Sequence, residues 1–120
     1  MANEVTFSVS LKASKNNASV NQTANLFADM AGAQMTQVTQ NIGTTAELVD
    51  FGDITGAPQL VMIRNLSTTR FVELGGDSGL TVFKTKIAAG GACLFTPSSA
   101  TLYAKADTSA ANILIVAVEA

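Results

Sequence analysis

Apolar and polar residues alternate along much of this chain, and this period of two constrains its fold more than any other feature. Residues 5–12 show it best, because each apolar residue there is followed by a polar one. The apolar positions are Val5, Phe7, Val9 and Leu11. A period of two places successive side chains on opposite faces of a β-strand. We therefore predict a half-buried strand over residues 5–12.

The pattern recurs to the end of the chain, in short segments separated by residues that favour turns. These segments are 34–42, 47–51, 60–63, 71–74, 80–87, 92–96, 101–106 and 112–118. Eight or nine short strands without a convincing long helix predict an all-β fold, either an antiparallel β-sandwich or a jelly roll. No linker and no change of composition is visible, so we expect a single domain over residues 1–120.

Two stretches near the N-terminus are less regular. Residues 14–23 are polar and rich in Asn, so we expect a loop or a flexible arm there. Val20 is the one apolar residue larger than Ala in this stretch, which therefore cannot supply a core of its own. Residues 26–32 fit a single helical turn and a short strand equally well, because Leu26, Phe27 and Met30 have helical spacing.

The alternation also predicts which apolar side chains fill the core. They are Phe7, Val61, Ile63, Val72, Phe83, Leu94, Phe95, Leu102, Ile113, Ile115 and Val116.

The amino-acid composition excludes several kinds of chemistry. The chain has no His, no Trp and a single Cys. It therefore cannot form a Ser-His-Asp or Cys-His catalytic site, a zinc site built on His or several Cys, or an internal disulfide. We expect no enzyme activity, no cofactor and no metal.

Short strings that resemble catalytic motifs have simpler interpretations. Residues 76–79 read Gly-Asp-Ser-Gly, but without a general base the Ser78 hydroxyl cannot be activated, so we interpret the string as a turn. Asp50 and Asp53 are too few oxygen donors for calcium and are interpreted as solvated loop residues. Cys93, between Ala92 and Leu94, is interpreted as a small buried apolar residue.

The charge pattern limits the partners. The net charge is −2, the sequence pI is about 4.8, and the basic residues are scattered, so we expect no binding to nucleic acid. The longest apolar run, residues 113–118, is too short to cross a bilayer, and no secretory signal is visible. We expect a protein made in the cytosol, without a membrane partner.

Three strings occur in an order that resembles a known group of proteins. Residues 64–76 read Arg-Asn-Leu-Ser-Thr-Thr-Arg-Phe-Val-Glu-Leu-Gly-Gly, residues 86–92 read Lys-Ile-Ala-Ala-Gly-Gly-Ala, and residues 102–106 read Leu-Tyr-Ala-Lys-Ala. This succession resembles small β-sandwich virion structural proteins of tailed bacteriophages. The resemblance covers residues 60–120. It implies a head decoration (cement), neck or tail component, and it carries over no catalytic residue.

The resemblance leads to the expected function. We expect a non-enzymatic capsid decoration protein, located in a virion that assembles in the bacterial host cytoplasm. It would bridge major capsid subunits, and it would itself be a homo-oligomer. The alternatives are a neck, tail or fibre-associated subunit and a carbohydrate-binding module. The second is disfavoured because glycan sites need aromatic platforms, and the chain has Tyr103 but no Trp.

Polar loops are the candidate assembly contacts. The candidates lie within residues 14–23 and 52–58 and are Ser14, Lys15, Asn16, Asn17, Asn21, Asp53 and Thr55. We expect residues 14–23 to be mobile in the isolated protein and to become ordered against a neighbouring subunit.

Overall fold

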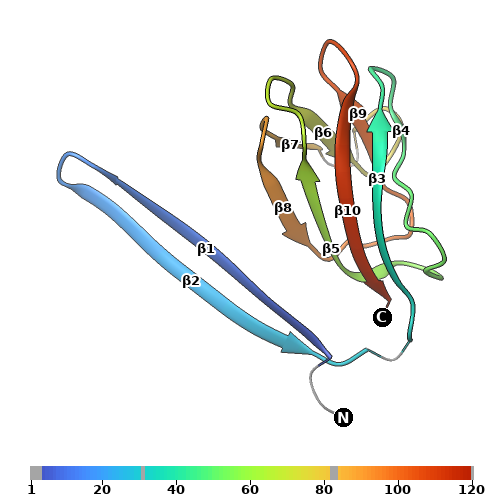
Figure 1. Ribbon diagram of the computed structural model, residues 1–120, viewed down its shortest axis with the longest axis horizontal. Helices are drawn as coiled ribbons and strands as arrows, with labels where there is room; N and C mark the ends of the chain where they lie inside the picture. The colour runs from blue at the N-terminus through green and yellow to red at the C-terminus, as the bar shows by residue number, and fades with distance from the viewer. Residues whose placement is uncertain (1–3, 31, 82–83, 120) are drawn as a thin grey trace. The chain divides into compact units, whose positions relative to one another are not determined.

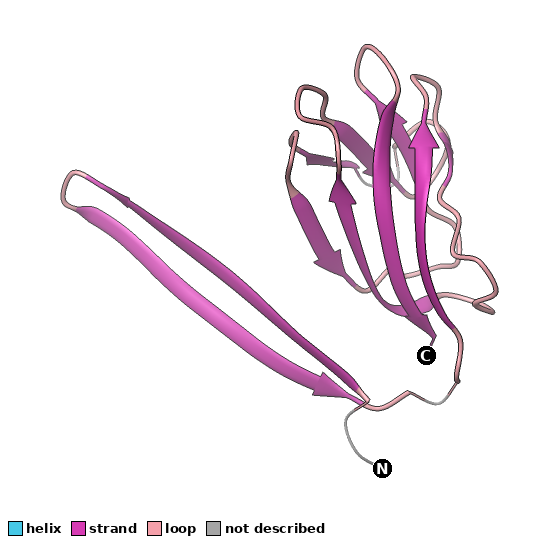
Figure 2. Cartoon of the chain, in the orientation of Figure 1, coloured by secondary structure: helices cyan, strands magenta, loops and turns pink. Residues whose placement is uncertain are grey.

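The computed structural model describes residues 4–30, 32–81 and 84–119, and within these ranges it contains ten strands and no helix. Every strand pairing is antiparallel, so the predicted all-β antiparallel fold is confirmed (Figures 1 and 2). The strands are β1 (Val5–Lys15), β2 (Ala18–Ala28), β3 (Met35–Ile42), β4 (Glu47–Leu48), β5 (Pro58–Asn65), β6 (Val72–Gly75), β7 (Lys84–Ile87), β8 (Ala92–Phe95), β9 (Tyr103–Ala106) and β10 (Ala111–Glu119).

The chain divides into two compact units, Met1–Ala31 and Gly32–Ala120. The first contains β1 and β2, which form a two-stranded sheet that we call the ribbon (residues 5–28). The second contains the other eight described strands and is called the sandwich. The single domain expected over residues 1–120 stays a prediction.

The sandwich consists of two four-stranded sheets. One has the strand order β3-β10-β5-β8 and the other has the order β4-β9-β6-β7 (Figure 1). In the first sheet, β10 is paired on both sides, with Ile115 opposite Val38 of β3 and Ile63 of β5. In the second sheet, β9 lies between β4 and β6. The two edge strands of the second sheet are only two and four residues long, and short edges of this kind limit pairing with other chains.

The core lies between the two sheets of the sandwich and takes side chains from both. Its fully buried members include Ile63 and Ile115 from one sheet and Leu74 and Ala104 from the other. Phe51 follows β4 and also lies in the core, although no regular strand continues that far. Alternate residues of each strand face inward, as the period of two requires.

Six of the predicted core residues are buried in the sandwich. They are Val61, Ile63, Val72, Leu102, Ile113 and Ile115. Phe95 is half-buried and packs against this core, whereas Phe7 is half-buried and belongs to the ribbon. The prediction for Phe83 lies outside the described residues.

The core prediction for Phe7 was wrong, because this residue belongs to the ribbon and not to the core of the sandwich. The predictions for Leu94 and Val116 were wrong for a geometric reason. Adjacent residues of a strand point to opposite faces, so Ile115 and Val116 cannot both face the core, and neither can Leu94 and Phe95. Leu94 and Val116 both pair with Met62, on the face of the sheet opposite the core, and both are half-buried.

The largest difference from the sequence analysis concerns residues 14–23. They were expected to form a loop or flexible arm, but β1 extends to Lys15, β2 begins at Ala18, and only Asn16 and Asn17 form the turn. In residues 18–28 the alternation of apolar and polar residues is weak. Most side chains on both faces of this strand are exposed, so neither face has to be apolar. The same strand continues to Ala28, so the strand interpretation holds for the first part of residues 26–32.

Candidate functional site

The pairing of β1 with β2 sorts the ribbon's side chains onto two unlike faces. Residues directly opposite each other in an antiparallel pair project from the same face, and Phe7 pairs with Leu26. The apolar face comprises Val5, Phe7, Val9, Leu11, Ala13, Ala18, Val20, Ala24, Leu26 and Ala28, interrupted by Gln22 and ending at Lys15 beside the turn. The polar face comprises Thr6, Ser8, Ser10, Lys12, Ser14, Ser19, Asn21, Thr23, Asn25 and the one large apolar residue Phe27.

Much of the apolar face is exposed. The exposed fraction is 67% for Leu11, 55% for Val20 and 51% for Leu26. A two-stranded hairpin is marginally stable by itself, because it lacks a second layer against which to bury its apolar side. The ribbon therefore presents apolar surface that is available for a partner to cover.

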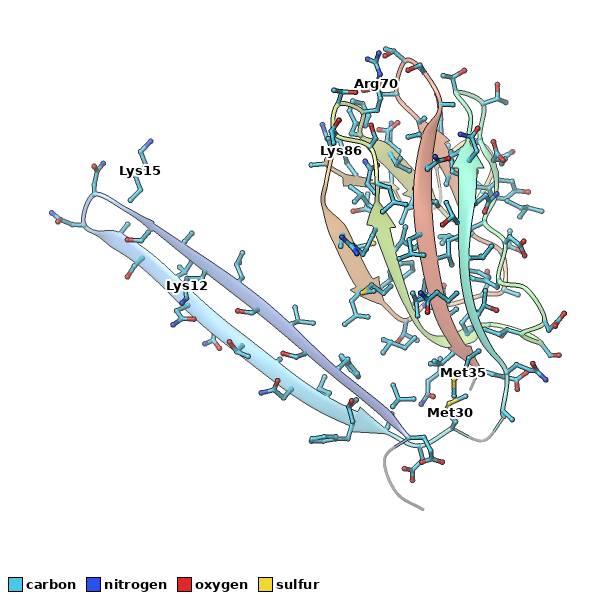
Figure 3. All side chains as sticks on the ribbon, viewed as in Figure 1. Lys12, Lys15, Met30, Met35, Arg70 and Lys86 are labelled. Carbon is cyan, nitrogen blue, oxygen red and sulfur yellow. The ribbon has the colours of Figure 1, made fainter. Side chains whose placement is uncertain are left out.

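The polar face is hydrogen-bonded and carries Lys12, whereas Lys15 lies at the turn end of the apolar face. The Thr23 hydroxyl donates to the Ser10 hydroxyl across the two strands, at 3.4 Å. Residues 5–28 contain two charged side chains, Lys12 and Lys15, and no acidic residue (Figure 3). The ribbon therefore carries a net charge of +2, opposite in sign to the net charge of −2 of the whole chain.

Five of the predicted contact residues lie together near the turn of the ribbon. Ser14 and Lys15 end β1, Asn16 and Asn17 form the turn, and Asn21 lies on β2 opposite Lys12. Asn16 has a positive φ of 54°, a conformation that Asn tolerates better than most residues other than Gly. The Asn-rich composition that suggested a loop thus reflects a two-residue hairpin turn.

The other two predicted contact residues belong to the sandwich. Asp53 and Thr55 lie in the segment between β4 and β5. Asp53 is exposed, beside Gly52, whose φ is 64°. The backbone N–H of Thr55 donates a hydrogen bond to Glu119 Oε2 at 3.2 Å, and this bond holds the segment in place.

Glu119, which the sequence analysis did not single out, ties three segments of the sandwich together. Besides Thr55, its carboxylate accepts hydrogen bonds from the backbone N–H groups of Ala33 and Gln34, at 3.0 and 3.2 Å. These hydrogen bonds, with that from Thr55 the strongest cause, lower the pKa of Glu119, while partial desolvation opposes them. A Cβ atom on Gly32 would overlap the Glu119 side chain, so Gly is required there while Glu119 keeps this position. Glu119 is therefore a structural clamp at the start of β3.

The protease-like string has a structural role. The Asp77 carboxylate accepts a hydrogen bond from the backbone N–H of Thr81 and another from its hydroxyl, both at 2.6 Å. Ser78 is exposed within this turn. The Asp77 side chain thus closes this loop.

The remaining candidate groups are also accounted for by structure. Asp50 Oδ1 accepts a hydrogen bond from the backbone N–H of Gly52 at 2.8 Å, which stabilises the turn before Asp53. Burial raises the pKa of the Cys93 thiol, which packs beside the core and is therefore disfavoured as a thiolate nucleophile. The described residues contain no group of three or more potential metal ligands.

The outer faces of the two sandwich sheets differ. On the β4-β9-β6-β7 sheet, Glu73 lies opposite Lys86 on one side and Lys105 on the other, so that face is charged. On the β3-β10-β5-β8 sheet the corresponding face, which we call the apolar sheet face, is largely hydrocarbon. Its apolar members are Met35, Leu60, Met62, Leu94, Leu114, Val116 and Val118, of which Met35 is the most exposed. Gln37 and Thr39 of β3 and Arg64 of β5 lie on the same face and border this apolar area.

Comparison with protein-family models, with curated proteins and with solved structures finds no match for this chain. In the described ranges there is no helix of the length and hydrophobicity needed to cross a membrane. The candidate functional surfaces are therefore those that the geometry itself provides, namely the ribbon and the apolar sheet face.

Proposed function

We propose that this protein is a non-enzymatic structural protein of a bacteriophage virion, and that it binds the outside of the capsid as a decoration (cement) protein. The observation that carries the proposal is the ribbon. It has two eleven-residue strands, an exposed apolar face and no second layer of its own. An element of this kind is suited to be stabilised by a neighbouring subunit in an assembly.

The mechanism of such a protein is mechanical. The sandwich supplies a stable body, and the ribbon supplies a contact that reaches a neighbouring subunit. Each contact is modest, but many copies in one shell add up by avidity and oppose expansion of the head. The resemblance of residues 60–120 to small virion sandwiches supports this assignment, and the lack of His in the sequence supports a role without catalysis.

The proposal is tested by the composition and stability of virions from the phage that encodes the chain. Quantitative mass spectrometry should find hundreds of copies per particle, and heads lacking the protein should release DNA at a lower temperature. Purified protein added back should restore the release temperature. A dozen or fewer copies would overturn the decoration role in favour of a neck or tail subunit. Absence from the particle would overturn any virion role.

A variant of the ribbon tests whether this element contributes to decoration of the capsid. Leu11→Gln together with Leu26→Gln should reduce occupancy on the capsid, because both side chains are exposed on the apolar face. The matched control is Ser10→Gln together with Asn25→Gln, which alters the polar face of the same two strands. Equal occupancy for the two variants would contradict a role for the apolar face.

A further inference from the structure

We propose that the partner that covers the ribbon is a second copy of this chain: the apolar face of one copy's ribbon packs on the apolar sheet face of another, and the exchange is reciprocal. The inference deepens the proposed function by naming the neighbouring subunit. It rests on that proposal only for its biological setting, because it predicts the association of the purified protein in solution.

The two surfaces have matching chemistry. Each is largely apolar, with exposed side chains on the ribbon and half-exposed ones on the sheet. On the sheet, Met62 has Val116 on one side and Leu94 on the other, so the patch is continuous across three strands. Val118 of β10 lies opposite Leu60 of β5, and this pair extends the apolar patch along the two strands. The other sheet presents charges on its outer side and would gain nothing from an apolar cover.

The ribbon and the apolar sheet face also match in length. The ribbon has eleven residues per strand, which corresponds to about 37 Å. The central strand β10 has nine residues, which corresponds to about 31 Å. A two-stranded layer laid along β10 and β5 thus covers the apolar sheet face over most of its length. Two β-layers pack face to face in this way about 10 Å apart.

The buried area favours a reciprocal exchange over a single ribbon-on-sheet contact. Two strands about 10 Å wide in all give the ribbon one face of roughly 370 Å², so a single ribbon-on-sheet contact buries about 750 Å² in total. That lies below the range of stable interfaces, which begins near 1,200 Å². Reciprocal exchange doubles the buried area to about 1,500 Å², close to the standard interface. Two ribbons packed on each other would bury only the smaller area and would leave both sheet faces open.

Charge also favours the pairing of ribbon with sheet. Residues 5–28 have two Lys and no acidic residue, although Glu4 and Asp29 flank them, whereas residues 32–119 contain seven acidic and five basic residues. Two ribbons packed on each other would bring their Lys side chains together, and a ribbon packed on the acidic sandwich avoids this repulsion. A reciprocal contact of this kind has two-fold symmetry, so it closes at a dimer.

The test is the association state of the full chain, measured by sedimentation equilibrium. The wild-type protein should be a dimer with a dissociation constant in the micromolar range or tighter. Leu11→Gln with Leu26→Gln removes the ribbon side of the contact, and Met62→Gln with Val116→Gln removes the sheet side. Each double variant should raise the dissociation constant at least tenfold. Two double variants serve as controls: Ser10→Gln with Asn25→Gln on the polar face, and Lys86→Gln with Lys105→Gln on the charged sheet. Both should leave the dissociation constant unchanged.

Mixing the two disruptive variants separates this proposal from its rivals. The ribbon variant keeps an intact sheet face, and the sheet variant keeps an intact ribbon. A mixed dimer of the two therefore has one intact contact, whereas a homodimer of either variant has none. The mixture should accordingly form heterodimers with a lower dissociation constant than either homodimer.

A wild-type protein that stays monomeric at high concentration would overturn the inference. So would a dimer that the Met62 and Val116 changes leave intact while circular dichroism shows a folded sandwich, because that dimer would be held by ribbons alone. A monomeric protein that still decorates capsids would refute the exchange and leave the proposed function standing. A dimer that is absent from virions would support the exchange and refute the proposed function.

Discussion

The side-chain amide of Asn65 donates a hydrogen bond of 2.7 Å to the backbone carbonyl oxygen of Arg70, from a position only 2% exposed at the end of β5. The same nitrogen lies 3.2 Å from the carbonyl oxygen of Ile87, and Asn65 Oδ1 accepts a hydrogen bond from the backbone N–H of Ser67 at 3.0 Å. One buried amide thus closes the β5–β6 turn and joins it to the end of β7. This geometry gives a physical reason for Asn within the string on which the virion resemblance rests.

Replacing Asn65 should therefore destabilise the sandwich well beyond the loss of one hydrogen bond. Asn65→Ala leaves buried backbone groups without a partner, at about 1–3 kcal/mol in the free energy of unfolding, and Asn65→Asp should cost at least as much because it lacks the donor. Asn41→Ala is the matched control, because its amide hydrogen bond to Asn112 is exposed and should matter by less than about 0.5 kcal/mol. Urea unfolding curves measure both. Equal effects would show that Asn65 is not buried as described.

A second pair of variants tests which face of β10 points inward. Ile115→Ala removes a fully buried side chain and should cost about 2–5 kcal/mol. Val116→Ala should cost only about 1 kcal/mol, because this residue is half-buried on the apolar sheet face. The measurement is the unfolding free energy of each variant under conditions that keep the protein monomeric. A larger cost at Val116 would mean that the register of β10 is shifted by one residue.

The stability contributed by Glu119 should depend on pH. Its pKa is lower in the folded protein than in the unfolded chain, because the ionised carboxylate accepts backbone hydrogen bonds from Thr55, Gln34 and Ala33. The contribution is therefore complete above the usual glutamate pKa of 4.5 and is lost as the pH falls through the lower folded value. The difference in unfolding free energy between wild type and Glu119→Gln should shrink from pH 7 toward pH 3. A difference that grew on acidification would contradict the clamp.

Gly32 and Glu119 should be energetically coupled. Adding a methyl group in Gly32→Ala forces the Glu119 carboxylate away from the backbone groups that it holds. Gly32→Ala should therefore destabilise the protein about as much as Glu119→Ala does, and the double variant should be no less stable than either alone. A double-mutant cycle measured by thermal unfolding would show this, and strictly additive effects would rule it out.

The turn of the ribbon should be sensitive at Asn16 and tolerant at Asn17. Asn16→Val places a β-branched residue at a positive φ and should cost about 1–2 kcal/mol locally, whereas Asn16→Gly should be neutral or stabilising. Amide hydrogen exchange over residues 5–28 reports on the ribbon, and the unfolding temperature of the sandwich should not change because the ribbon is a separate compact unit. Equal exchange rates in Asn16→Val and Asn17→Val would argue against this turn.

The sequence alone determined the all-β class and the position of most strands, because alternation is a local property that any strand buried on one side displays. It failed at residues 14–23, where the exposed ends of two paired strands offer little contrast between their faces. It also misjudged Leu94 and Val116, since an apolar residue at the surface of a sheet looks like a core residue until the register is known.

The candidate site was located from the sequence only in part. Five of the seven proposed contact residues lie near the end of the ribbon, but Asp53 and Thr55 belong to the sandwich, and the exposed apolar face was not anticipated. Cross-strand pairing decides which residues share a face, and it depends on where the turn falls rather than on the composition of either strand. The roles of Asn65 and Glu119 depend on contacts between residues 5 to 86 positions apart, and only the tertiary structure brings those groups together.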